Sequence, residues 1–335
     1  MPTLEDVARR AGVSTATVSK VLSNTPYFTE QTRAKVLQAV EELGYIPHLA
    51  ARALSSGKTH IIGVVFPYVY DAIFADPMVL NILQGVEAEC SQRGHNMLLS
   101  TPRLTAAGAD ENYLRLIHSG YLDGVIALDN YPVASVLEPA HKEGIPCVAI
   151  GYHPTPYHVR SDDRSGGFQL MQHVVSLGHR RVGIIAVPPE NHLCVPERLA
   201  GLRAAAEAAG LDFDAMPLAY GDWSTPGGAR CAAELLARRP DLSAVICLND
   251  RMAMGAIQRA REMGRRVPAT LTVAGYDDIP MASVFAPPLT TISQQGPELG
   301  SRAARMLFDV LDGRQPEPVI MPTLLIARQS SAPPA

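Results

Sequence analysis

The stretch that decides the fold of the first part of the chain is EDVARRAGVSTATVSKVL, residues 5–22. Apolar side chains recur at helical spacing before Gly12 and again after Ser14. Glycine suits the left-handed position that ends a helix, and serine suits the N-cap that begins the next one. The pattern therefore predicts two short helices that are joined by a tight turn and cross at a steep angle.

The outer face of the second predicted helix bears side chains that packing does not require. They are short, polar or basic: Thr15, Ala16, Ser19 and Lys20. That composition favours a helix that lies in the DNA major groove, as the second helix of a helix-turn-helix does. An ordinary helical hairpin inside a larger core is the alternative. Farther along, Thr29 is predicted to cap a third helix, which ends at Gly44.

Length and composition indicate a globular protein of more than one domain. The chain has 335 residues, of which 47% are hydrophobic. No apolar run approaches the roughly 20 residues that a membrane-spanning helix needs, and the first residues lack the apolar stretch of a secretory signal. The five cysteines show no paired spacing. These features predict a cytoplasmic protein with reduced thiols and with no metal or other cofactor.

The net charge of −4 argues against general nucleic-acid binding, but the charges are unevenly distributed. Residues 1–60 carry seven basic and five acidic side chains, whereas acidic side chains are in excess over the rest of the chain. This distribution permits a small basic head on an acidic body.

Residues 47–58 are predicted to be a linker between the head and the body. Pro47 interrupts the preceding helical pattern, and the alanine-rich segment HLAARAL (residues 48–54) is too short for a stable isolated helix. Ser55, Ser56 and Gly57 then supply a flexible exit. We expect this linker to become helical only when something stabilises it.

From Ile61 onward, short β-rich apolar runs alternate with helical stretches. The runs are IIGVVF (61–66), GVIAL (124–128), PCVAIG (146–151), RVGIIAV (181–187), SAVICL (243–248) and LTVAGY (271–276). They show little polar alternation, which is typical of strands buried on both faces of a parallel sheet. There are more βαβ units than one sheet needs, so we predict two doubly wound α/β lobes with a cleft between them.

Polar side chains follow these strands, at the end where parallel sheets bind ligands. Asp129, Asn249 and Asp277 come directly after three of the strands. Arg198 opens the helix after a fourth strand, and Trp223, the only tryptophan, lies in a polar loop. Carboxylates, an amide and a guanidinium around a flat aromatic ring suit a sugar-like ligand, because its hydroxyls need polar partners and its apolar face stacks on a ring.

Each of these residues also has a purely structural interpretation. Trp223 could pack in a core, and Arg198 could pair with a nearby acid. Asp250 and Asp278 are predicted to be helix N-caps, and the histidines, which show no ligand spacing, are predicted to be structural. No nucleophile elbow, phosphate-binding loop, zinc-protease motif or dinucleotide fingerprint occurs, which favours binding over catalysis.

Taken together, these motifs make the chain resemble the LacI/GalR family of bacterial transcriptional regulators, essentially from end to end. The most specific part of the resemblance lies in the head, TLEDVARRAGVSTATVSKVLSN (residues 3–24), and in the linker, GYIPHLAARAL (residues 44–54). ERLAG, LNDRMAMGA, VPATLTVAGYDDIP and PPLTTISQ follow in the order that the family shows.

The resemblance implies a small all-α helix-turn-helix head and an α/β periplasmic-binding-protein-like effector domain of two doubly wound lobes. The expected boundaries are 1–46 for the head, 47–58 for a hinge helix and 59–335 for the effector domain. Within that domain we expect lobe 1 at about 60–159 and 290–316, and lobe 2 at about 160–289 and 317–335.

The resemblance also implies a homodimer whose two heads bind the halves of a near-palindromic operator in double-stranded DNA. Thr15, Ala16 and Lys20 are expected to face the bases. The residues expected to hold phosphates are Ser14, Thr17, Ser19, Asn24 and Thr29. The other expected DNA contacts are Leu4 in the first helix and His48, Ala51 and Leu54 in the hinge, where Leu54 would wedge into the central minor-groove step.

By the same resemblance, a small-molecule effector binds in the cleft of a repressor and switches its affinity for the operator. The effector is expected to be a sugar or a sugar derivative. Its expected contacts are Tyr68, Phe74, Asp129, Arg198, Trp223, Asn249, Asp277 and Gln294. Gly151 has no side chain where some sugar-binding members carry an acid, so the particular ligands of those members are not expected here.

Alternatives remain open at this stage. The effector could be a non-sugar or phosphorylated metabolite, or a protein co-regulator, because Arg198 suits a phosphate as well as a hydroxyl. A solute-binding protein is opposed by the head and by the missing secretory signal. A sugar-processing enzyme fused to a head is opposed by the lack of a catalytic motif.

Replacing the expected wedge residue tests the hinge assignment. Leu54→Ala is expected to weaken operator binding sharply, because the hinge loses the apolar side chain that enters the minor groove. Ligand binding by the body should be unchanged. The two affinities can be measured by mobility shift and by calorimetry, and normal operator binding by the variant would show that the hinge assignment is wrong.

Overall fold

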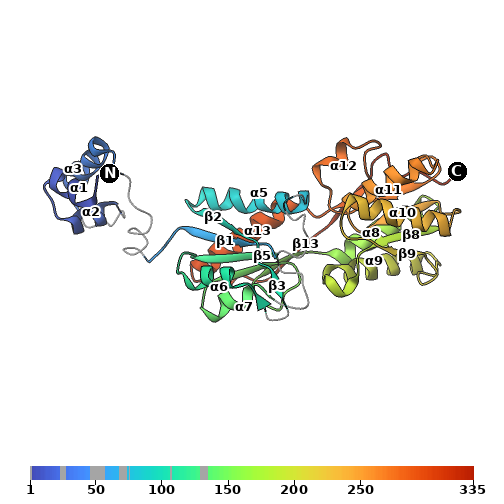
Figure 1. Ribbon diagram of the computed structural model, residues 1–335, viewed down its shortest axis with the longest axis horizontal. Coiled ribbons are helices and arrows are strands. Elements are labelled where there is room, and N and C mark those ends of the chain that lie inside the picture. The colour runs from blue at the N-terminus through green and yellow to red at the C-terminus, as the bar shows by residue number, and fades with distance from the viewer. Residues whose placement is uncertain are drawn as a thin grey trace.

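The structure, a computed structural model, describes residues 2–22, 28–45, 57–67, 74, 76–105, 108–128 and 135–335. The predicted hinge lies outside these ranges except for residues 57–58. Six candidate site residues also lie outside them: Asn24, His48, Ala51, Leu54, Tyr68 and Asp129. The described residues form a small helical head, at one end, and an elongated body of two lobes (Figure 1).

The first two helices of the head are α1 (Leu4–Ala11) and α2 (Thr15–Leu22). α1 begins with a capping box between Thr3 and Asp6, and it ends at Gly12, whose φ of 67° is left-handed. The Ser14 hydroxyl accepts a hydrogen bond from the Thr17 N–H at 3.2 Å, as an N-cap does. The predicted helix break at Gly12 and restart at Ser14 are both confirmed.

α3 (Glu30–Leu43) completes the head. Thr29 caps it by accepting a hydrogen bond from the Thr32 N–H at 3.3 Å, and Gly44 ends it with a φ of 60°. The buried side chains of the head form one core: Val7, Ala8, Val18, Val21, Val36, Ala39 and Tyr45. A core of this size stabilises an independent domain only marginally.

Lobe 1 of the body is built on a parallel six-stranded sheet. In spatial order its strands are β2 (Asn96–Ser100), β1 (Ile61–Val65), β5 (Gly124–Leu128), β6 (Cys147–Ile150), β7 (His158–Ser161) and β13 (Val319–Met321). One face is covered by α5 (Pro77–Gln92) and α13 (Gly296–Leu311), and the other by α6 (Glu111–His118) and α7 (Leu137–Lys142). A short hairpin joins β3 (Leu104–Thr105) to β4 (Gly108–Ala109). Successive residues of β5 contact opposite helix layers, which explains the uninterrupted apolar sequence of the strand.

Lobe 2 is built on a parallel four-stranded sheet. Its strands, in spatial order, are β9 (Leu218–Tyr220), β8 (Val182–Ala186), β10 (Ala244–Cys247) and β11 (Thr272–Ala274). Its helices are α8 (Asp163–Ser176), α9 (Cys194–Ala208), α10 (Thr225–Arg238), α11 (Asp250–Glu262) and α12 (Pro280–Val284), with a 3₁₀ turn at Pro189–Asn191. All the strands that the apolar runs predict are present in the two lobes, and so is the predicted α/β architecture.

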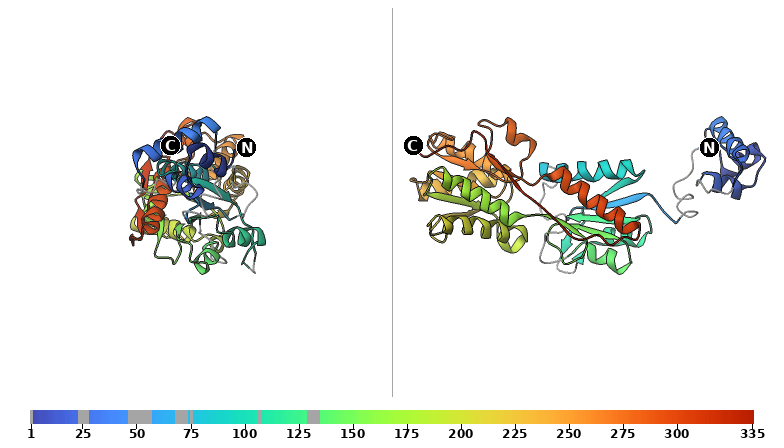
Figure 2. Two further views of the ribbon diagram at one scale, coloured as in Figure 1. Left: turned by 90° about the vertical axis from the view of Figure 1, so that its left-hand side faces the viewer. Right: turned by 180° about the vertical axis from the view of Figure 1, so that it is seen from behind.

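The chain passes between the lobes three times within the described residues: from β7 to α8, from β12 (Thr291–Ser293) to α13, and from β13 to β14 (Leu324–Ile326). β12 and β14 pair antiparallel, and Figure 2 shows these segments running along the body. The chain returns to lobe 1 at α13, whose buried side chains belong to the core of that lobe. The expected boundary at 316 is wrong by one strand, because β13 pairs with the edge strand β7 of lobe 1. A strand of three residues is too short to be recognised from composition.

Pairs of helices in the body cross with their backbones in contact at glycines. The pairs are α5 with α13 (Gly85 and Gly300), α8 with α9 (Gly167 and Gly201), and α10 with α11 (Gly228 and Gly255). A Cβ at Gly201 would lie 2.0 Å from the carbonyl oxygen of Arg164, and a Cβ at Gly167 would lie 2.2 Å from that of Arg198. Only glycine permits such an approach. The contact of α8 with α9 brings Asp163, at the start of α8, to the Arg198 side chain.

None of the described helices combines the length and the apolar sequence that crossing a bilayer requires.

Candidate functional site

The face of the head that is expected to contact DNA is exposed. Thr15, Ala16 and Lys20 are exposed on α2, as are the capping residues Ser14 and Thr29. The other described candidates, Leu4, Thr17 and Ser19, are half-buried. The structure therefore leaves the three residues expected at the bases accessible along one helix.

The first turns of α2 and α3 offer hydroxyls and backbone N–H groups to an anion. The Ser14 and Thr17 hydroxyl oxygens lie 2.9 Å apart, and those of Thr29 and Thr32 lie 3.0 Å apart. Helix N-termini attract phosphate through their unpaired N–H groups and the helix dipole. Leu4 differs, because its side chain packs against the core of the head, so it can offer DNA little beyond its backbone.

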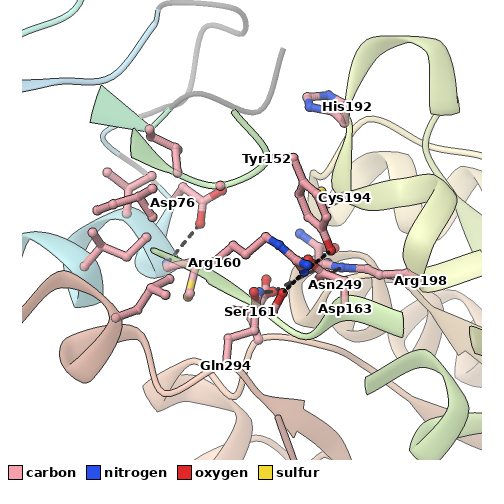
Figure 3. Close-up of a pocket in the computed structure, with 18 of the residues that line it drawn as sticks. Asp76, Tyr152, Arg160, Ser161, Asp163, His192, Cys194, Arg198, Asn249 and Gln294 are labelled. Atoms are coloured by element: carbon pink, nitrogen blue, oxygen red, sulfur yellow. Dashed lines mark hydrogen bonds and ion pairs between the residues drawn. The ribbon is translucent and has the colours of Figure 1, made fainter. Parts of the chain in front are cut away.

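A cavity of about 130 Å³ lies between the two lobes (Figure 3). Lobe 1 contributes a mainly apolar wall formed by Met78, Val79, Ile82, Leu128, Ile150 and Leu299, with Asp76 and Tyr152 as its polar members. Lobe 2 contributes a polar wall formed by Asp163, His192, Cys194, Arg198, Trp223, Asn249 and Asp277. Arg160, Ser161 and Gln294 lie at the segments that connect the lobes. Two unlike walls suit a ligand with one apolar face and one polar edge.

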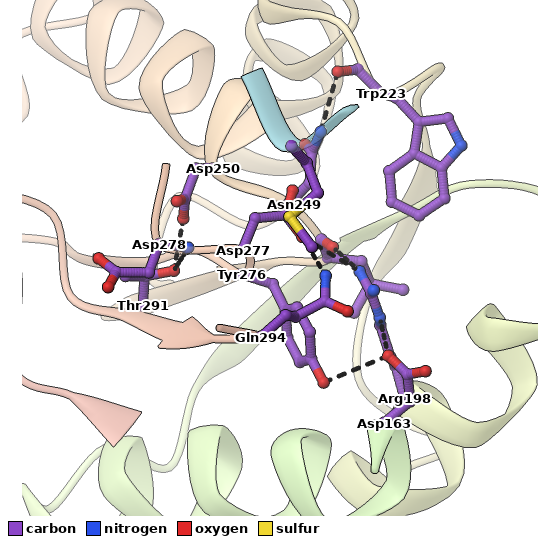
Figure 4. A network of polar contacts seen from close by, with 12 residues as sticks. Asp163, Arg198, Trp223, Asn249, Asp250, Tyr276, Asp277, Asp278, Thr291 and Gln294 are labelled. Carbon is purple, nitrogen blue, oxygen red and sulfur yellow. Dashed lines mark hydrogen bonds and ion pairs between the residues drawn. The ribbon is translucent and has the colours of Figure 1, made fainter. Parts of the chain in front are cut away.

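Arg198 lies at the centre of the polar wall (Figure 4). Its Nε donates to Asp163 at 2.7 Å, and its Nη1 donates to the Leu248 carbonyl oxygen at 2.6 Å. The guanidinium lies 3.9 Å from the centre of the Tyr276 ring and 5.8 Å from that of Trp223. The predicted pairing of Arg198 with an acid is therefore present, and the paired side chain also lines the cavity, where a ligand could reach it.

Trp223 and Asn249 are fixed to each other and to the loop before α9. The Asn249 side chain caps α11 by accepting from the Met252 N–H at 2.9 Å, and it donates to the Trp223 carbonyl oxygen at 3.0 Å. The Trp223 indole N–H donates to His192 Nε2 at 2.9 Å. Burial, together with the nearby Arg198 charge, lowers the pKa of His192 to about 4, so this histidine is a neutral acceptor at neutral pH.

Asp277 lies at the end of β11, where it accepts a hydrogen bond from Gln294 Nε2 at 2.6 Å. Its carboxylate oxygen is 3.8 Å from Arg198 Nη1. Burial raises the pKa of Asp277 well above its ordinary value, although the Arg198 charge opposes this. Asp277 and Trp223 both have positive φ angles, of 119° and 64°. Strained backbone of this kind is concentrated at ligand sites, where the surrounding structure holds it in place.

Ser161 is buried, and its hydroxyl has no hydrogen-bond partner among the described residues. It lines the cavity, next to Arg160. Arg160 donates to the Tyr152 hydroxyl and to the Ser161 carbonyl oxygen, both at 3.3 Å, and has no carboxylate partner within the part of the chain that the structure describes. A buried polar group without a partner is costly, so a ligand that bonds to Ser161 would gain affinity.

The lobes also contact each other beside the cavity. Asp76 caps α5 of lobe 1 by accepting from the Met78 N–H at 3.0 Å. Its other carboxylate oxygen lies 3.5 Å from Arg251 Nη1, on α11 of lobe 2. Both side chains are largely buried, so solvent screens the pair less than it would at the surface. The ion pair favours the arrangement of the lobes seen here.

The sequence predictions for this region have mixed outcomes. Arg198, Trp223, Asn249, Asp277 and Gln294 come together around one cavity, whereas Phe74 is 58% exposed and does not line it.

Two predicted helix caps are wrong. Asn249, not Asp250, caps α11, and Asp278 forms an ion pair of 2.6 Å with Arg328. Asp250 is instead buried, where it accepts hydrogen bonds from the Ile279 N–H and the Thr291 hydroxyl. Asn249 and Asp250 are adjacent, and either residue type can cap a helix, so the sequence alone does not show which of the two is the cap and which is buried in the first turn.

Sequence reasoning missed several lining residues: Asp76, Tyr152, Arg160, Ser161, Asp163, His192 and Cys194. In line with the prediction that the histidines are structural, His179 bonds to Ser243, Thr272 and Ala332. His192 holds Trp223 through a hydrogen bond and also lines the cavity. Tyr152 directly follows the predicted strand at 146–151, so the rule that found Asp277 could have found it as well. Arg160 lies near the end of β7, which the sequence analysis did not recognise as a strand. No group of three or more histidine, cysteine or acidic side chains could hold a metal ion in the described ranges.

Comparison with protein families gives two matches. Residues 3–48 match the model of bacterial regulatory proteins, lacI family, and residues 171–331 match that of a periplasmic binding protein-like domain. The HTH-type transcriptional regulator CelR of Thermobifida fusca is 36% identical, over 98% of each chain. The HTH-type transcriptional repressor PurR of Photobacterium profundum is 33% identical, over 92% of each chain.

Solved structures similar to this chain include two with ligands. A complex of the transcriptional regulator CelR with cellobiose is 32% identical, with a TM-score of 0.73 over 98% of this chain and 100% of that one. The Lac repressor dimer bound to operator and the anti-inducer ONPF is 27% identical, with a TM-score of 0.85 over 99% of each chain.

The buried carboxyl of Asp250 predicts a pH dependence of stability. Burial raises its pKa from 3.8 to about 7, so the folded state binds a proton more tightly than the unfolded state does. The wild-type protein should therefore lose stability relative to Asp250→Asn as the pH rises from about 4 to about 7, by up to about 4 kcal/mol, and no further above that. Urea unfolding between pH 4.5 and 8.5 measures the difference.

Asp110→Asn is the control for this experiment. Backbone hydrogen bonds from Tyr113 and Arg103 lower the pKa of Asp110, so its contribution to stability is lost only as the pH falls below that range. A difference between wild type and Asp250→Asn that does not vary with pH would contradict the assignment.

Proposed function

The chain belongs to the LacI family of bacterial transcriptional regulators, and from that premise we propose that it is a repressor whose affinity for operator DNA is set by a sugar-like ligand in the cleft between the lobes. Members of this family are regulators and not enzymes, so the enzyme alternative is excluded. The solute-binding alternative is excluded too, because the chain carries the DNA-binding head of the family.

The arrangement of polar groups in the cleft carries the proposal for the ligand class. Hydroxyl-rich ligands need acceptors and donors held in fixed positions, and Asp163, Asp277 and Asn249 are each fixed by a neighbour. The Trp223 ring and the apolar wall of lobe 1 can cover the less polar faces of a sugar ring. The similarity to CelR, which was solved with cellobiose, supports the same class.

The size of the cavity implies that the lobes must separate for a ligand to bind. Pockets that hold drug-sized ligands usually enclose about 300–1,000 Å³, whereas this cavity has about 130 Å³. A disaccharide would need the lobe 1 wall to move away from Arg198. The ion pair of Asp76 with Arg251 opposes that movement, so ligand binding and lobe arrangement are coupled.

In the proposed switch, the ligand favours one arrangement of the two lobes. In a dimer, that arrangement changes the distance between the two copies of lobe 1, and with it the distance between the two linkers. When the linkers separate, their hinge helices lose their mutual packing, and operator affinity falls. The ligand can shift this equilibrium only by its difference in affinity for the two arrangements.

An anionic ligand is the second candidate, and Arg160 favours it. Arg198 already has a carboxylate partner, but Arg160 bonds only to neutral groups among the described residues. A phosphate or carboxylate on the ligand would give Arg160 a charged partner. Phosphorylated sugars therefore belong in any ligand screen.

We propose that a second copy of the chain covers an apolar surface formed by α5 and α12, which lie along the same side of the body in two views (Figures 1 and 2). Leu80 of α5 is 50% exposed, and Met281 and Val284 of α12 are 52% and 74% exposed. Exposed apolar side chains on two helices of the same side can mark an interaction site. The Lac repressor, a structural neighbour, is a dimer on its operator.

The ligand class can be tested on the full chain with an operator selected from random duplexes. Cellobiose, other sugars and their phosphate esters are each added to a mobility shift. We expect a neutral or phosphorylated sugar to reduce operator affinity by at least about tenfold. No effect from any of these compounds would contradict the proposal.

Ser161→Ala locates the responding site. Because the Ser161 hydroxyl has no protein partner among the described residues, its removal should leave thermal stability nearly unchanged. It should lower the affinity for the responding sugar about tenfold, as the loss of one hydrogen bond does. Ser301→Ala is the matched control, since Ser301 is buried in lobe 1 against Glu89 and does not line the cavity.

The proposed dimer surface is tested with Val284→Glu, which places a charge at its most exposed side chain. Light scattering should show monomers in place of dimers, and operator affinity should fall by more than about tenfold because the two heads are no longer joined. Tyr121→Glu is the control, because it places a charge at an exposed side chain that lies on neither α5 nor α12. A Val284→Glu variant that remains dimeric would show that the surface is assigned wrongly.

A further inference from the structure

The segment that leaves the predicted linker is fastened to lobe 1 by one carboxylate. Asp123, just before β5, accepts hydrogen bonds from the Thr59 N–H at 2.7 Å, the Thr59 hydroxyl at 2.8 Å and the His60 N–H at 2.9 Å. Thr59 and His60 directly follow the linker and precede β1. The Asp123 side chain is only 9% exposed, so these charge-assisted bonds are shielded from water.

The same segment is held from both sides by backbone hydrogen bonds. The Asn96 N–H donates to the His60 carbonyl oxygen at 2.8 Å, and the Asp123 N–H donates to the Ile61 carbonyl oxygen at 2.9 Å. His60 has a φ of 56°, in the left-handed region that side-chain-bearing residues avoid. Such a conformation persists only where neighbouring groups fix it, and here Asp123 and Asn96 do so.

A cluster of aromatic rings covers the segment of Thr59 and His60. The His60 and His95 rings lie 4.9 Å apart, and His95 packs edge-on against Phe308 of α13, also at 4.9 Å. His95 Nε2 lies 3.7 Å from the Asp123 carboxylate, while its Nδ1 donates to the Arg93 carbonyl oxygen at 2.9 Å. The Thr59–His60 segment is therefore attached to the sheet through Asp123, and through His95 to the helices α5 and α13 that cover one face of the sheet.

We propose that Asp123 is a positioning residue that couples the orientation of lobe 1 to the DNA-binding heads, by fixing the point and direction at which the linker leaves the lobe. The inference rests on the proposed function, in which the distance between the linkers sets operator affinity. Nothing in the contacts of Asp123 is needed for the cleft, whose residues lie at the opposite ends of the strands.

The physical argument is one of chain entropy. If the carboxylate is removed, Thr59 and His60 are no longer fixed to the sheet, and a movement of lobe 1 must then pass through two residues that are free to move. Operator binding must order those residues again, which costs affinity. Asp123→Ala should therefore lower operator affinity about tenfold or more while ligand affinity stays unchanged.

The experiment uses the full chain and the operator that the wild type selects. Operator affinity is compared for wild type, Asp123→Ala, Asp123→Asn and Thr59→Val. Thr59→Ser is the conservative variant, because serine keeps the hydroxyl that valine lacks. The expected order of affinity is wild type and Thr59→Ser, then Thr59→Val and Asp123→Asn, then Asp123→Ala. In the absence of DNA, hydrogen exchange of residues 58–61 should be faster in Asp123→Ala than in wild type.

Asp110→Ala is the matched control, because Asp110 also accepts two backbone N–H bonds in lobe 1, from Tyr113 and Arg103, but lies away from the linker. If Asp123 only stabilised the fold, Asp123→Ala would lower operator affinity no more than Asp110→Ala does, provided that the two variants lose a similar amount of thermal stability. That outcome would overturn the inference, as would unchanged hydrogen exchange at residues 58–61. A wild-type chain that selects no duplex would instead overturn the proposed function.

Discussion

The cleft depends on one buried guanidinium. A charge as deeply buried as that of Arg198 is tolerated only when carboxylate, carbonyl and aromatic partners surround it. Asp163 comes from α8, the Leu248 carbonyl from the end of β10, and Tyr276 from the end of β11, so the charge joins three elements of lobe 2. The close crossing of α8 and α9 at Gly167 makes the ion pair possible, because any side chain there would push the helices apart. Packing that stabilises the lobe thus also fixes the polar wall of its site.

That charge balance has a consequence for the ligand. Asp163 already neutralises Arg198, and burial favours the protonated form of Asp277, so the polar wall presents donors and acceptors more than net charge. Neutral hydroxyls fit such a wall better than a dianion does, and an anion is favoured only toward Arg160. Apart from Asp76, Tyr152, Arg160 and Ser161, the side chains of lobe 1 that line the cavity are apolar. A ligand is therefore expected to bind first to lobe 2, with lobe 1 as the part that adjusts to it.

The sequence was informative wherever one chemical signal maps onto one structural role. Gly12 and Ser14 predicted a helix end and a helix start, and the strand-end rule found Asn249 and Asp277, because parallel strands place their carboxyl ends at one edge. The N-cap prediction failed at Asp250, where a shift of one residue decides which side chain caps the helix. The strand-end rule failed at Ser161, because β7 is short, half polar and paired with a strand from the far end of the chain. Contacts made by segments that pass between the lobes join residues far apart in the sequence, so they leave no local sequence pattern.

In the proposed switch, lobe 1 acts as a lever between the ligand and the DNA. The cavity is lined by residues at the carboxyl ends of its strands, such as Leu128 and Ile150, whereas the linker is fastened by Asp123 at their amino ends. Strands of five residues separate these two edges by about 16 Å. A six-stranded parallel sheet with helices on both faces is a stiff layer, so a rotation imposed at the cleft is carried to the linker exit without rearrangement inside the lobe. A lobe that moves as one body needs only firm attachment at each end. Asp76 supplies that attachment through its ion pair beside the cavity, and Asp123 supplies it through its three hydrogen bonds to the segment that leads to the head.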